Sequence, residues 1–417
     1  MSSPTLERPA DSGTTTDNFA EFDQYVMHTY ARFQLALERG QGCRVWSPDG
    51  KSFLDFVAGI ATCTLGHAHP AMVEAVTNQI QKLHHVSNLY YLAPQGELAK
   101  WLVQNSCADR AFFCNSGAEA NEGAIKLARK YAHVKLGIDQ PVILTAHASF
   151  HGRTLATITA TGQPKYQKNF TPLPTGFDYI TYNDIADLEA KVSQYTGRLA
   201  AIMLEPLQGE GGVNPGDRLY FQRVRQLCDD HKALLIFDEV QVGMGRSGML
   251  WGYENLGVQP DVFTSAKGLG GGIPIGAMMC KSSCDVFEPG DHASTFGGNP
   301  FACSVALAVC QTIVKENLIG NARERGQQLR QGLEAIVSQY SSHLQLVRGW
   351  GLIDGLVLAE DSKIMARDVV AACLERGLLL VPAGLKVVRF VPPLTVSAAE
   401  IDEALQIMAQ AMEVLAA

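Results

Sequence analysis

The sequence lacks the features on which several classes of protein depend. No apolar run approaches the roughly 18 residues that a membrane-spanning helix needs, and the run at 305–310 already ends at Gln311. No run of Lys and Arg exceeds two residues, and the formal net charge is −8. A chain with this charge pattern is poorly suited to bind nucleic acid or an anionic membrane, so we expect neither partner.

Paired cysteines are also missing. The ten cysteines are scattered singly without a CxxC motif, and the closest two, Cys280 and Cys284, are four positions apart. This usage predicts buried thiols in a reducing cytoplasm rather than disulfides. His67 and His69 stand close together, but no second group of His, Cys or carboxylate residues accompanies them. We therefore predict no metal site.

The first 18 residues have no apolar core. This segment is polar and rich in Ser and Thr, which predicts a disordered tail. Because it carries acidic residues and no hydrophobic stretch, neither a secretory signal nor a typical transit peptide is expected. The chain as a whole is 47% hydrophobic and 8% aromatic over 417 residues. That composition and length predict a two-lobed α/β enzyme.

The stretch from 233 to 276 carries the clearest chemical signal. Two apolar runs, ALLIF and DVFTSA, are typical of short buried strands, and they lead into Asp238 and Lys267. Four glycines follow Lys267 within five positions. Ligands of open α/β sheets bind outside the carboxyl ends of the strands. We therefore expect both charged side chains to face one ligand crevice.

An aspartate and a lysine could also form a simple buried ion pair. Gln241, three positions after Asp238, and the glycine run favour a bulky ligand instead. Pyridoxal phosphate needs a carboxylate beside its ring nitrogen, a hydrogen-bond donor at its phenolic oxygen and a lysine for its aldehyde. A free lysine must first lose its proton, which costs about 4.6 kcal/mol at pH 7. Condensation with the cofactor removes that cost.

A phosphate site is predicted further upstream. The short strand 111–114 runs into Ser116 and Gly117, and a helix starts near Ala118. A helix that opens on a Ser-Gly turn presents unpaired backbone N–H groups and the positive end of its dipole, which together bind anions. Such turns are common, so the signal becomes specific only together with Asp238 and Lys267.

Local patterns outline the remaining elements. The segment 45–56 is typical of a hairpin, and 69–85 has the periodicity of a helix whose apolar side faces the core. Strands are predicted at 142–144 and in the AAIML run, and a helix after Phe301. Towards the C-terminus, helices at 321–340, 365–376 and 398–415 alternate with strands at 352–358, 378–381 and 386–390.

Three long motifs in this order, FDEVQVGMGRSG, SAKGLGGGIPIGAM and STFGGNP, resemble the class III aminotransferases, and the resemblance runs from about Gly40 to the C-terminus. It implies the fold type I of pyridoxal-phosphate-dependent transferases. In that fold a large domain, expected at 67–319, has a mostly parallel central sheet flanked by helices. A smaller α+β domain would combine residues 19–66 with residues 320–417.

The resemblance also implies a role for individual residues. Lys267 would be the catalytic lysine, Asp238 and Gln241 would bind the cofactor ring, and Phe150 and Val240 would cover its two faces. The phosphate would lie on Gly117 and Ala118, with Ser116 adjacent, and Thr295 would reach the phosphate of the other subunit in a homodimer with shared active sites. Taken from the residues alone, Phe150 could equally be a core aromatic residue and Arg153 a surface cation. By resemblance the substrate-binding residues are Arg153, Ser294, Glu210 and Arg389, with Glu210 pairing reversibly with Arg389.

The implied reaction moves an ω-amino group to 2-oxoglutarate, with N2-acetylornithine as the expected donor. The sequence departs from two related patterns: Ile60 stands where ornithine enzymes have tyrosine, and Thr62-Cys63 stands where many enzymes for the acetylated donor have Val-Asn. The first departure disfavours free ornithine, and the second leaves the preference open. Alternatives are a relative acting on ornithine, succinylornithine or 4-aminobutyrate, an aminomutase without an external amino acceptor, and a non-catalytic binding protein.

Overall fold

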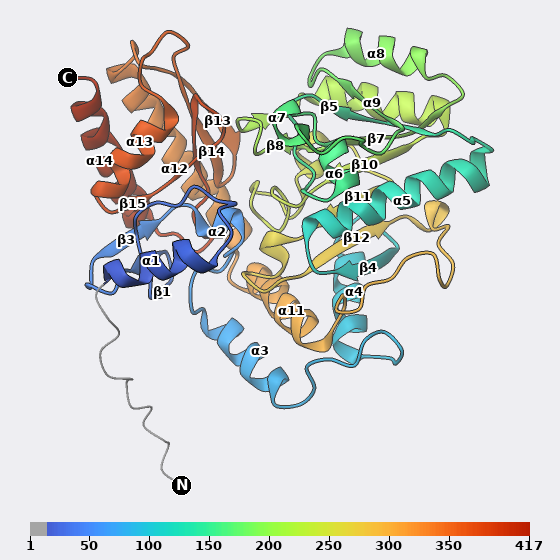
Figure 1. Ribbon diagram of the computed structural model, residues 1–417, viewed down its shortest axis with the longest axis horizontal. Coiled ribbons are helices and arrows are strands. Elements are labelled where there is room, and N and C mark those ends of the chain that lie inside the picture. The colour runs from blue at the N-terminus through green and yellow to red at the C-terminus, as the bar shows by residue number, and fades with distance from the viewer. Residues whose placement is uncertain (1–14) are drawn as a thin grey trace.

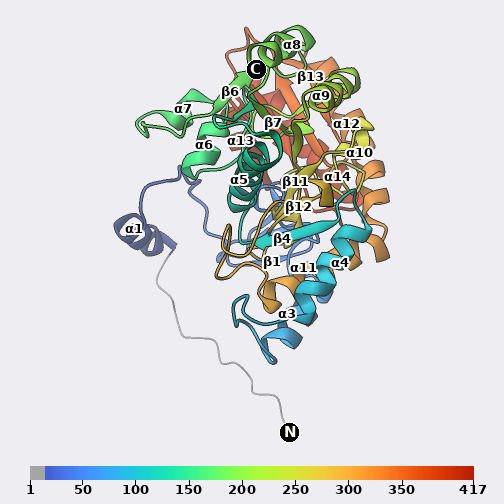
Figure 2. The same cartoon turned by 90° about the vertical axis from the view of Figure 1, so that its right-hand side faces the viewer.

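The computed structural model describes residues 15–417. Most of the predicted tail, residues 1–14, lies outside the described residues. Helix α1 (Thr15–Tyr25) begins within the last four residues of the predicted tail, which ends at residue 18. This helix lies at the periphery of the molecule (Figure 2). Two lobes are visible in Figure 1, one built from the middle of the chain and the other from both of its ends.

A seven-stranded sheet forms the centre of the larger lobe, and its strand order is β4-β12-β11-β10-β7-β5-β6. The four pairings from β11 to β6 are parallel, whereas β12 is antiparallel to both of its neighbours. All residues of β5, β7 and β10 are buried, as expected for a sheet covered on both faces. The strands are β4 (Arg110–Cys114), β5 (Val142–Ala146), β6 (Phe177–Ile180), β7 (Leu199–Leu204), β10 (Leu234–Asp238), β11 (Val262–Ser265) and β12 (Gly276–Cys280).

Helices cover both faces of this sheet. Because side chains alternate along each strand, every strand contributes residues to the packing on each face. Helix α5 packs on one face against residues such as Ile236, and α4, α8, α9 and α11 share a second cluster with residues such as Leu235 and Phe237. The helices and helical turns of this lobe are α3 (Pro70–Ile80), α4 (Ala93–Gln104), α5 (Gly117–Leu136), α6 (Leu155–Ala160), α7 (Pro164–Gln167), α8 (Ile185–Gln194), α9 (Arg218–His231), α10 (Tyr253–Leu256), η1 (Lys267–Leu269), η2 (Ser282–Cys284) and α11 (Pro300–Lys315).

The smaller lobe joins the two ends of the chain through hydrogen bonds. Strand β3 pairs in parallel with β15, so that Leu54 lies beside Leu378, and a second sheet has the order β13-β14-β17-β16. The remaining elements are α2 (Ala58–Ala61), α12 (Leu318–Gln339), α13 (Ala366–Glu375), α14 (Ala398–Leu415), β1 (Arg39–Gln41), β2 (Arg44–Trp46), β3 (Ser52–Asp55), β8 (Leu207–Gln208), β9 (Asn214–Pro215), β13 (Leu344–Trp350), β14 (Ile353–Leu358), β15 (Leu378–Leu379), β16 (Val381–Pro382) and β17 (Val387–Phe390). The predicted α/β fold, with a mostly parallel sheet and a smaller α+β unit, is confirmed.

One helix differs from its prediction. The segment 69–85 forms α3 only over Pro70–Ile80, and none of its residues is buried. Met72 is partly buried and packs against the main core, whereas Val73 and Ile80 are 53% and 50% exposed, so the expected core-facing apolar side is only partly covered in this chain. Periodicity reports that one side of a helix is apolar and does not report what covers it.

All ten cysteines are free, and eight of them are buried.

Within residues 15–417 no single helix is long and apolar enough to cross a membrane. Helices α11 and α12, bent by 66° relative to each other, meet the criteria of length and composition only as a pair.

Candidate active site

A cavity of about 580 Å³ opens at the carboxyl ends of the parallel strands. Asp238 is the last residue of β10, and Lys267 follows the neighbouring β11 by two positions. The two strands pair in parallel with Asp238 opposite Thr264, so both side chains reach the same cavity. The sequence-predicted residues that line it are Ser116, Gly117, Ala118, Phe150, Arg153, Asp238, Val240, Gln241 and Lys267.

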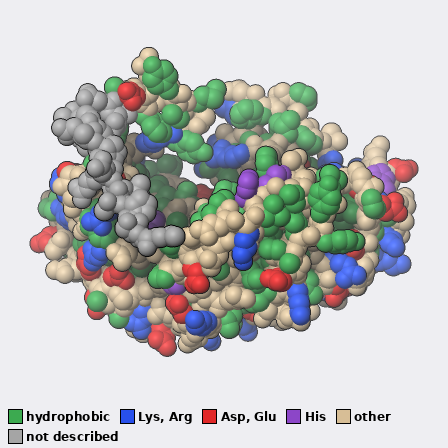
Figure 3. Space-filling view, turned by 90° about the horizontal axis from the view of Figure 1, so that it is seen from below, with side chains coloured by type: hydrophobic (Ala, Val, Ile, Leu, Met, Phe, Trp, Pro, Cys, Tyr) green, Lys and Arg blue, Asp and Glu red, His purple; other side chains and the backbone are tan. Residues whose placement is uncertain are grey.

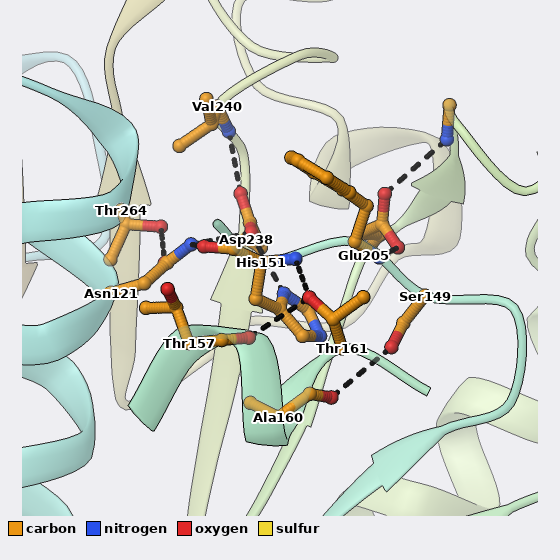
Figure 4. Close-up of polar contacts among 12 residues, drawn as sticks. Asn121, Ser149, His151, Thr157, Ala160, Thr161, Glu205, Asp238, Val240 and Thr264 are labelled. Carbon is orange, nitrogen blue, oxygen red and sulfur yellow. Dashed lines mark hydrogen bonds and ion pairs between the residues drawn. The ribbon is translucent and has the colours of Figure 1, made fainter. Parts of the chain in front are cut away.

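The carboxylate of Asp238 is held by three contacts (Figure 4). Its Oδ2 atom accepts a hydrogen bond from Asn121 Nδ2 at 2.7 Å and lies 2.8 Å from His151 Nδ1, and its Oδ1 accepts from the Val240 N–H at 3.0 Å. Thr264 donates to Asn121 Oδ1 at 2.7 Å, which fixes the orientation of that amide. The carboxylate is therefore oriented in advance, at an exposure of only 5%.

Asn121 and His151 were missed by the sequence reasoning. His151 follows Phe150 directly in the sequence, so its place beside a predicted cofactor-binding residue was a signal for it. Asn121 is 117 positions from Asp238 and lies on α5. Only the folded arrangement brings it to the end of β10.

Lys267 has an unusual backbone and an unusual electrostatic environment. Its φ angle is +43°, a left-handed conformation that is uncommon for residues with a Cβ. Burial lowers the pKa of its amine, an effect that the nearby Glu210 carboxylate opposes. The neutral amine, which is the nucleophilic form, is thereby made more available than in a free lysine.

Glu210 and Arg389 form an ion pair beside Lys267. Glu210 Oε1 accepts from Arg389 Nη1 at 2.7 Å, and Gln241 Oε1 accepts from the same Nη1 at 2.7 Å. Burial opposes ionisation of Glu210, but Arg389 and Lys267 outweigh it and lower the pKa of the carboxyl. Glu205, the other acid of this loop, is engaged differently: it accepts the backbone N–H groups of Phe150 and Gly209. Of the two acids, Glu210 is thus the one paired with arginine.

The amino end of α5 forms a cradle of backbone N–H groups. Ser116 caps the helix by accepting from the Glu119 N–H at 3.2 Å, and its own hydroxyl lies 3.2 Å from Glu119 Oε2. The Gly117 and Ala118 amides occupy the first helical positions, which have no intrahelical acceptor. A Cβ at position 117 would come within 2.7 Å of Val240 Cγ1. Glycine is therefore what allows Val240 to lie against this helix end.

Arg153 lines the cavity without a charged partner. No carboxylate oxygen within residues 15–417 lies within 4.0 Å of its guanidinium nitrogens, although the cavity contains Asp238 and Glu205. Phe150 is half-buried, and its ring centroid is 5.4 Å from the Arg153 Cζ. The guanidinium is thus available to an anionic ligand.

Ser294 and Thr295 do not line this cavity. They border a separate one of about 560 Å³, together with Asn88, Gln95 and His292. Ser294 Oγ nevertheless accepts from Asn115 Nδ2 at 3.2 Å, and Asn115 lines the first cavity. Within one chain the structure does not bring Thr295 to the Lys267 site.

The residues that depart from related patterns, Ile60 and Thr62-Cys63, lie in or directly after the segment 58–61. Residues 58–61, labelled α2, all have positive φ angles between 48° and 63°, and Thr62 follows them into the cavity. Ile60 and Cys63 line a neighbouring apolar cavity. Of these departures, only Thr62 borders the site that contains Lys267.

Comparison with known proteins defines the class. The model of the family described as aminotransferase class III matches residues 25–412, and the chain belongs to this family of pyridoxal-phosphate-dependent enzymes. The chain is 69% identical to the acetylornithine aminotransferase of Nostoc sp., over 98% of this chain and 96% of the relative. It is 66% identical to the acetylornithine aminotransferase of Synechocystis sp., over 95% and 93%.

Solved structures with the same fold include enzymes for two donors. The ornithine aminotransferase of Toxoplasma gondii ME49 matches with a TM-score of 0.93 and 33% identity, over 97% of this chain and 96% of that one. The N-acetylornithine aminotransferase of Stenotrophomonas maltophilia matches with a TM-score of 0.82 and 40% identity, over 95% and 99%. The fold is therefore shared by enzymes with different donors, and the donor must be argued from the site and the relatives.

Proposed function

We propose that the protein is an acetylornithine aminotransferase that uses pyridoxal phosphate. It transfers the δ-amino group of N2-acetyl-L-ornithine to 2-oxoglutarate and forms N-acetyl-L-glutamate 5-semialdehyde and L-glutamate, a step of arginine biosynthesis in the cytoplasm. The observation that carries the proposal is the meeting of Lys267 and Asp238 in one cavity with an anion cradle at α5. The high identity to acetylornithine aminotransferases over nearly the whole chain supports this donor.

The residues present fit the cofactor. The Gly117 and Ala118 amides would hold the phosphate, because they are helix-end donors without intrahelical acceptors. Asp238 would hold the ring nitrogen, Gln241 the phenolic oxygen, and Phe150 and Val240 would cover the ring. Ser116 contributes chiefly by capping the helix that carries the cradle.

When bound, pyridoxal phosphate supplies an aldehyde that condenses with amines and a protonated ring that accepts electron density from the substrate carbon. Lys267 would hold the cofactor until the incoming amine frees it. Its Nζ would then act as the base that takes a proton from the nitrogen-bearing carbon of the substrate, and as the conjugate acid it would donate the same proton to the carbon of the former aldehyde. Asp238 would face the ring nitrogen, because Asn121, His151 and the Val240 amide hold its carboxylate in one orientation. This places the stabilising charge before the reaction begins.

Two arginines would bind the carboxylates of the substrates. Arg153 has no carboxylate partner in the described chain, and a planar fork of donors suits a substrate carboxylate. Arg389 is paired with Glu210, which suits the half-reaction in which the δ-amino end of the donor enters. When 2-oxoglutarate enters, its second carboxylate would replace Glu210 on Arg389. Arg389 would then be paired with a carboxylate in both half-reactions. One site could thus accept both substrates without leaving this buried cation unpaired.

A homodimer with shared active sites accounts for the exposed apolar surface. Leu89, Tyr90 and Phe296 are 82%, 67% and 61% exposed, and Leu89 lines the same cavity as Thr295. Apolar side chains are visible on the face seen from below (Figure 3). Such a patch is typical of a protein interface, and a second copy of the chain covering it would bring Thr295 towards the cofactor phosphate of its partner.

The donor is tested by assaying a panel of ω-amino compounds with 2-oxoglutarate. We expect N2-acetylornithine to give the highest kcat/KM, ahead of ornithine, succinylornithine and 4-aminobutyrate. Equal or better use of free ornithine would overturn the choice of donor, and turnover without any 2-oxo acid would favour an aminomutase. A purified protein that is colourless and takes up no pyridoxal phosphate would contradict the enzyme assignment itself.

Glu210→Gln is expected to make Lys267 reactive at lower pH. Glu210 opposes the burial that lowers the pKa of Lys267, so removing its charge lowers that pKa further, and the freed Arg389 cation acts in the same direction. The neutral amine then predominates from a lower pH upwards. The measurement is the rate of pyridoxal phosphate uptake by the apoenzyme as a function of pH, with the exposed Glu334→Gln as control. A shift to higher pH would contradict this account of the charges.

A further inference from the structure

The Arg153 guanidinium is stacked on a tyrosine that no part of the proposed mechanism uses. Its Cζ lies 4.0 Å from the centroid of the Tyr166 ring and 5.4 Å from that of Phe150. The two rings meet edge to face, with centroids 5.8 Å apart at an angle of 83°. Arg153 is thus held over an aromatic corner at the mouth of the cavity.

The short helix that carries Tyr166 is fixed on both sides of it. Gln163 donates to the Ser149 carbonyl at 2.9 Å, immediately before Phe150, and Gln167 donates to the Thr161 carbonyl at 2.9 Å and to the Tyr179 hydroxyl at 2.8 Å. Helix α7 is therefore tied to the loop that carries Phe150 and Arg153. The ring of Tyr166 is thereby held next to the loop that carries the guanidinium.

Stacking and carboxylate binding use different parts of a guanidinium. An aromatic ring contacts the planar face, whereas a carboxylate binds the N–H groups along the edge. Arg153 is exposed and makes no ion pair within residues 15–417, so without the ring its long side chain would lose considerable rotational freedom on binding a substrate. Contact with Tyr166 limits that freedom in advance and leaves the edge open to the cavity.

We propose that Tyr166 is a positioning residue that presents the Arg153 guanidinium to a substrate carboxylate, and that it thereby contributes to the preference for carboxylate-bearing substrates. This inference rests on the proposed function. The alternative is that Tyr166 merely fills space between α7 and the Phe150 loop. The two alternatives differ in which substrates a Tyr166 variant would affect.

The test compares Tyr166→Leu, which removes the aromatic face, with Tyr166→Phe, which keeps it. The matched control is Lys165→Ala, because Lys165 Nζ lies 4.7 Å from the same ring centroid but does not line the cavity. The donors are N2-acetylornithine and its decarboxylated analogue, N-acetyl-1,4-diaminobutane. For each holoenzyme, KM, kcat and the visible absorbance of the cofactor are measured.

For Tyr166→Leu we expect KM for N2-acetylornithine to rise about threefold to thirtyfold, the range of a cation–π contact, with kcat and the cofactor spectrum little changed. Tyr166→Phe should restore KM, and Lys165→Ala should match the wild type. With the decarboxylated analogue, Tyr166→Leu and the wild type should behave alike, because no carboxylate reaches Arg153.

Two results would overturn the inference. One is an unchanged KM of Tyr166→Leu for N2-acetylornithine, and the other is an equal loss with both donors, which would indicate a purely structural role. Both presuppose a wild-type enzyme that transaminates N2-acetylornithine. A wild type without that activity would instead refute the proposed function, so the two failures are distinguishable.

Discussion

Lys267→Ala is expected to lower kcat for transamination by about 10⁴-fold or more, because in the proposed mechanism this one side chain would both hold the cofactor and transfer the proton. The position is specific: Lys267 follows β11 in a left-handed conformation, and burial lowers the pKa of its amine. No other lysine lines this cavity among residues 15–417. No neighbouring amine can therefore replace it.

This loss can be separated from misfolding. The Lys267→Ala variant keeps Asp238 and the amides at α5, so it should still bind pyridoxal phosphate and unfold at a temperature near that of the wild type. A small primary amine added to the solution should restore part of the activity by supplying the missing base. Lys135→Ala, an exposed substitution on α5, serves as control. Appreciable steady-state turnover by Lys267→Ala without added amine would refute the role of this lysine.

Asp238→Asn is expected to lower kcat by about 10²- to 10³-fold, the range for removal of a preorganised charge at a reacting centre. Asparagine has nearly the same shape, but its amide nitrogen cannot accept the hydrogen bonds that the second carboxylate oxygen of Asp238 accepts, and it carries no charge to stabilise a protonated ring. His151→Phe removes one of the contacts that orient Asp238 and is expected to cause a smaller loss of the same kind.

The measurement is kcat with saturating donor and 2-oxoglutarate, accompanied by the pyridoxal phosphate dissociation constant. Asp229→Asn is the control, since Asp229 is an exposed residue of α9 that lies outside the cavity. A kcat for Asp238→Asn within about fivefold of the wild type would show that the carboxylate is not electrostatically important.

Local sequence contained enough information for the positions of Asp238 and Lys267. Each follows an apolar run long enough for one strand, and a parallel sheet brings the carboxyl ends of neighbouring strands together. The strand before Ser116 and the helix after it could likewise be predicted from a short segment of the sequence. The overall fold could be predicted for the same reason, because its elements have strong local patterns and the family motifs occur in order.

Contacts between distant segments could not be derived in this way. Glu210 and Arg389 are 179 positions apart, and only the family resemblance suggested their pairing. The support of Arg153 by Tyr166 depends on how α7 is tied down, which no periodicity reveals. The extent to which α3 is buried could not be predicted, because periodicity shows that one side of a helix is apolar and not how much of that side is covered. Thr295 remains a prediction, since its role requires a second chain.

The most direct test of the central claim is reduction of the purified holoenzyme with borohydride, followed by peptide mapping. We expect the pyridoxyl group on Lys267. When N2-acetylornithine is added before the reductant, Lys267 should carry no pyridoxyl group. When 2-oxoglutarate is added after the donor and still before the reductant, the pyridoxyl group should again be found on Lys267. A label on a different lysine, or a label on Lys267 that the amino donor does not displace, would contradict the account.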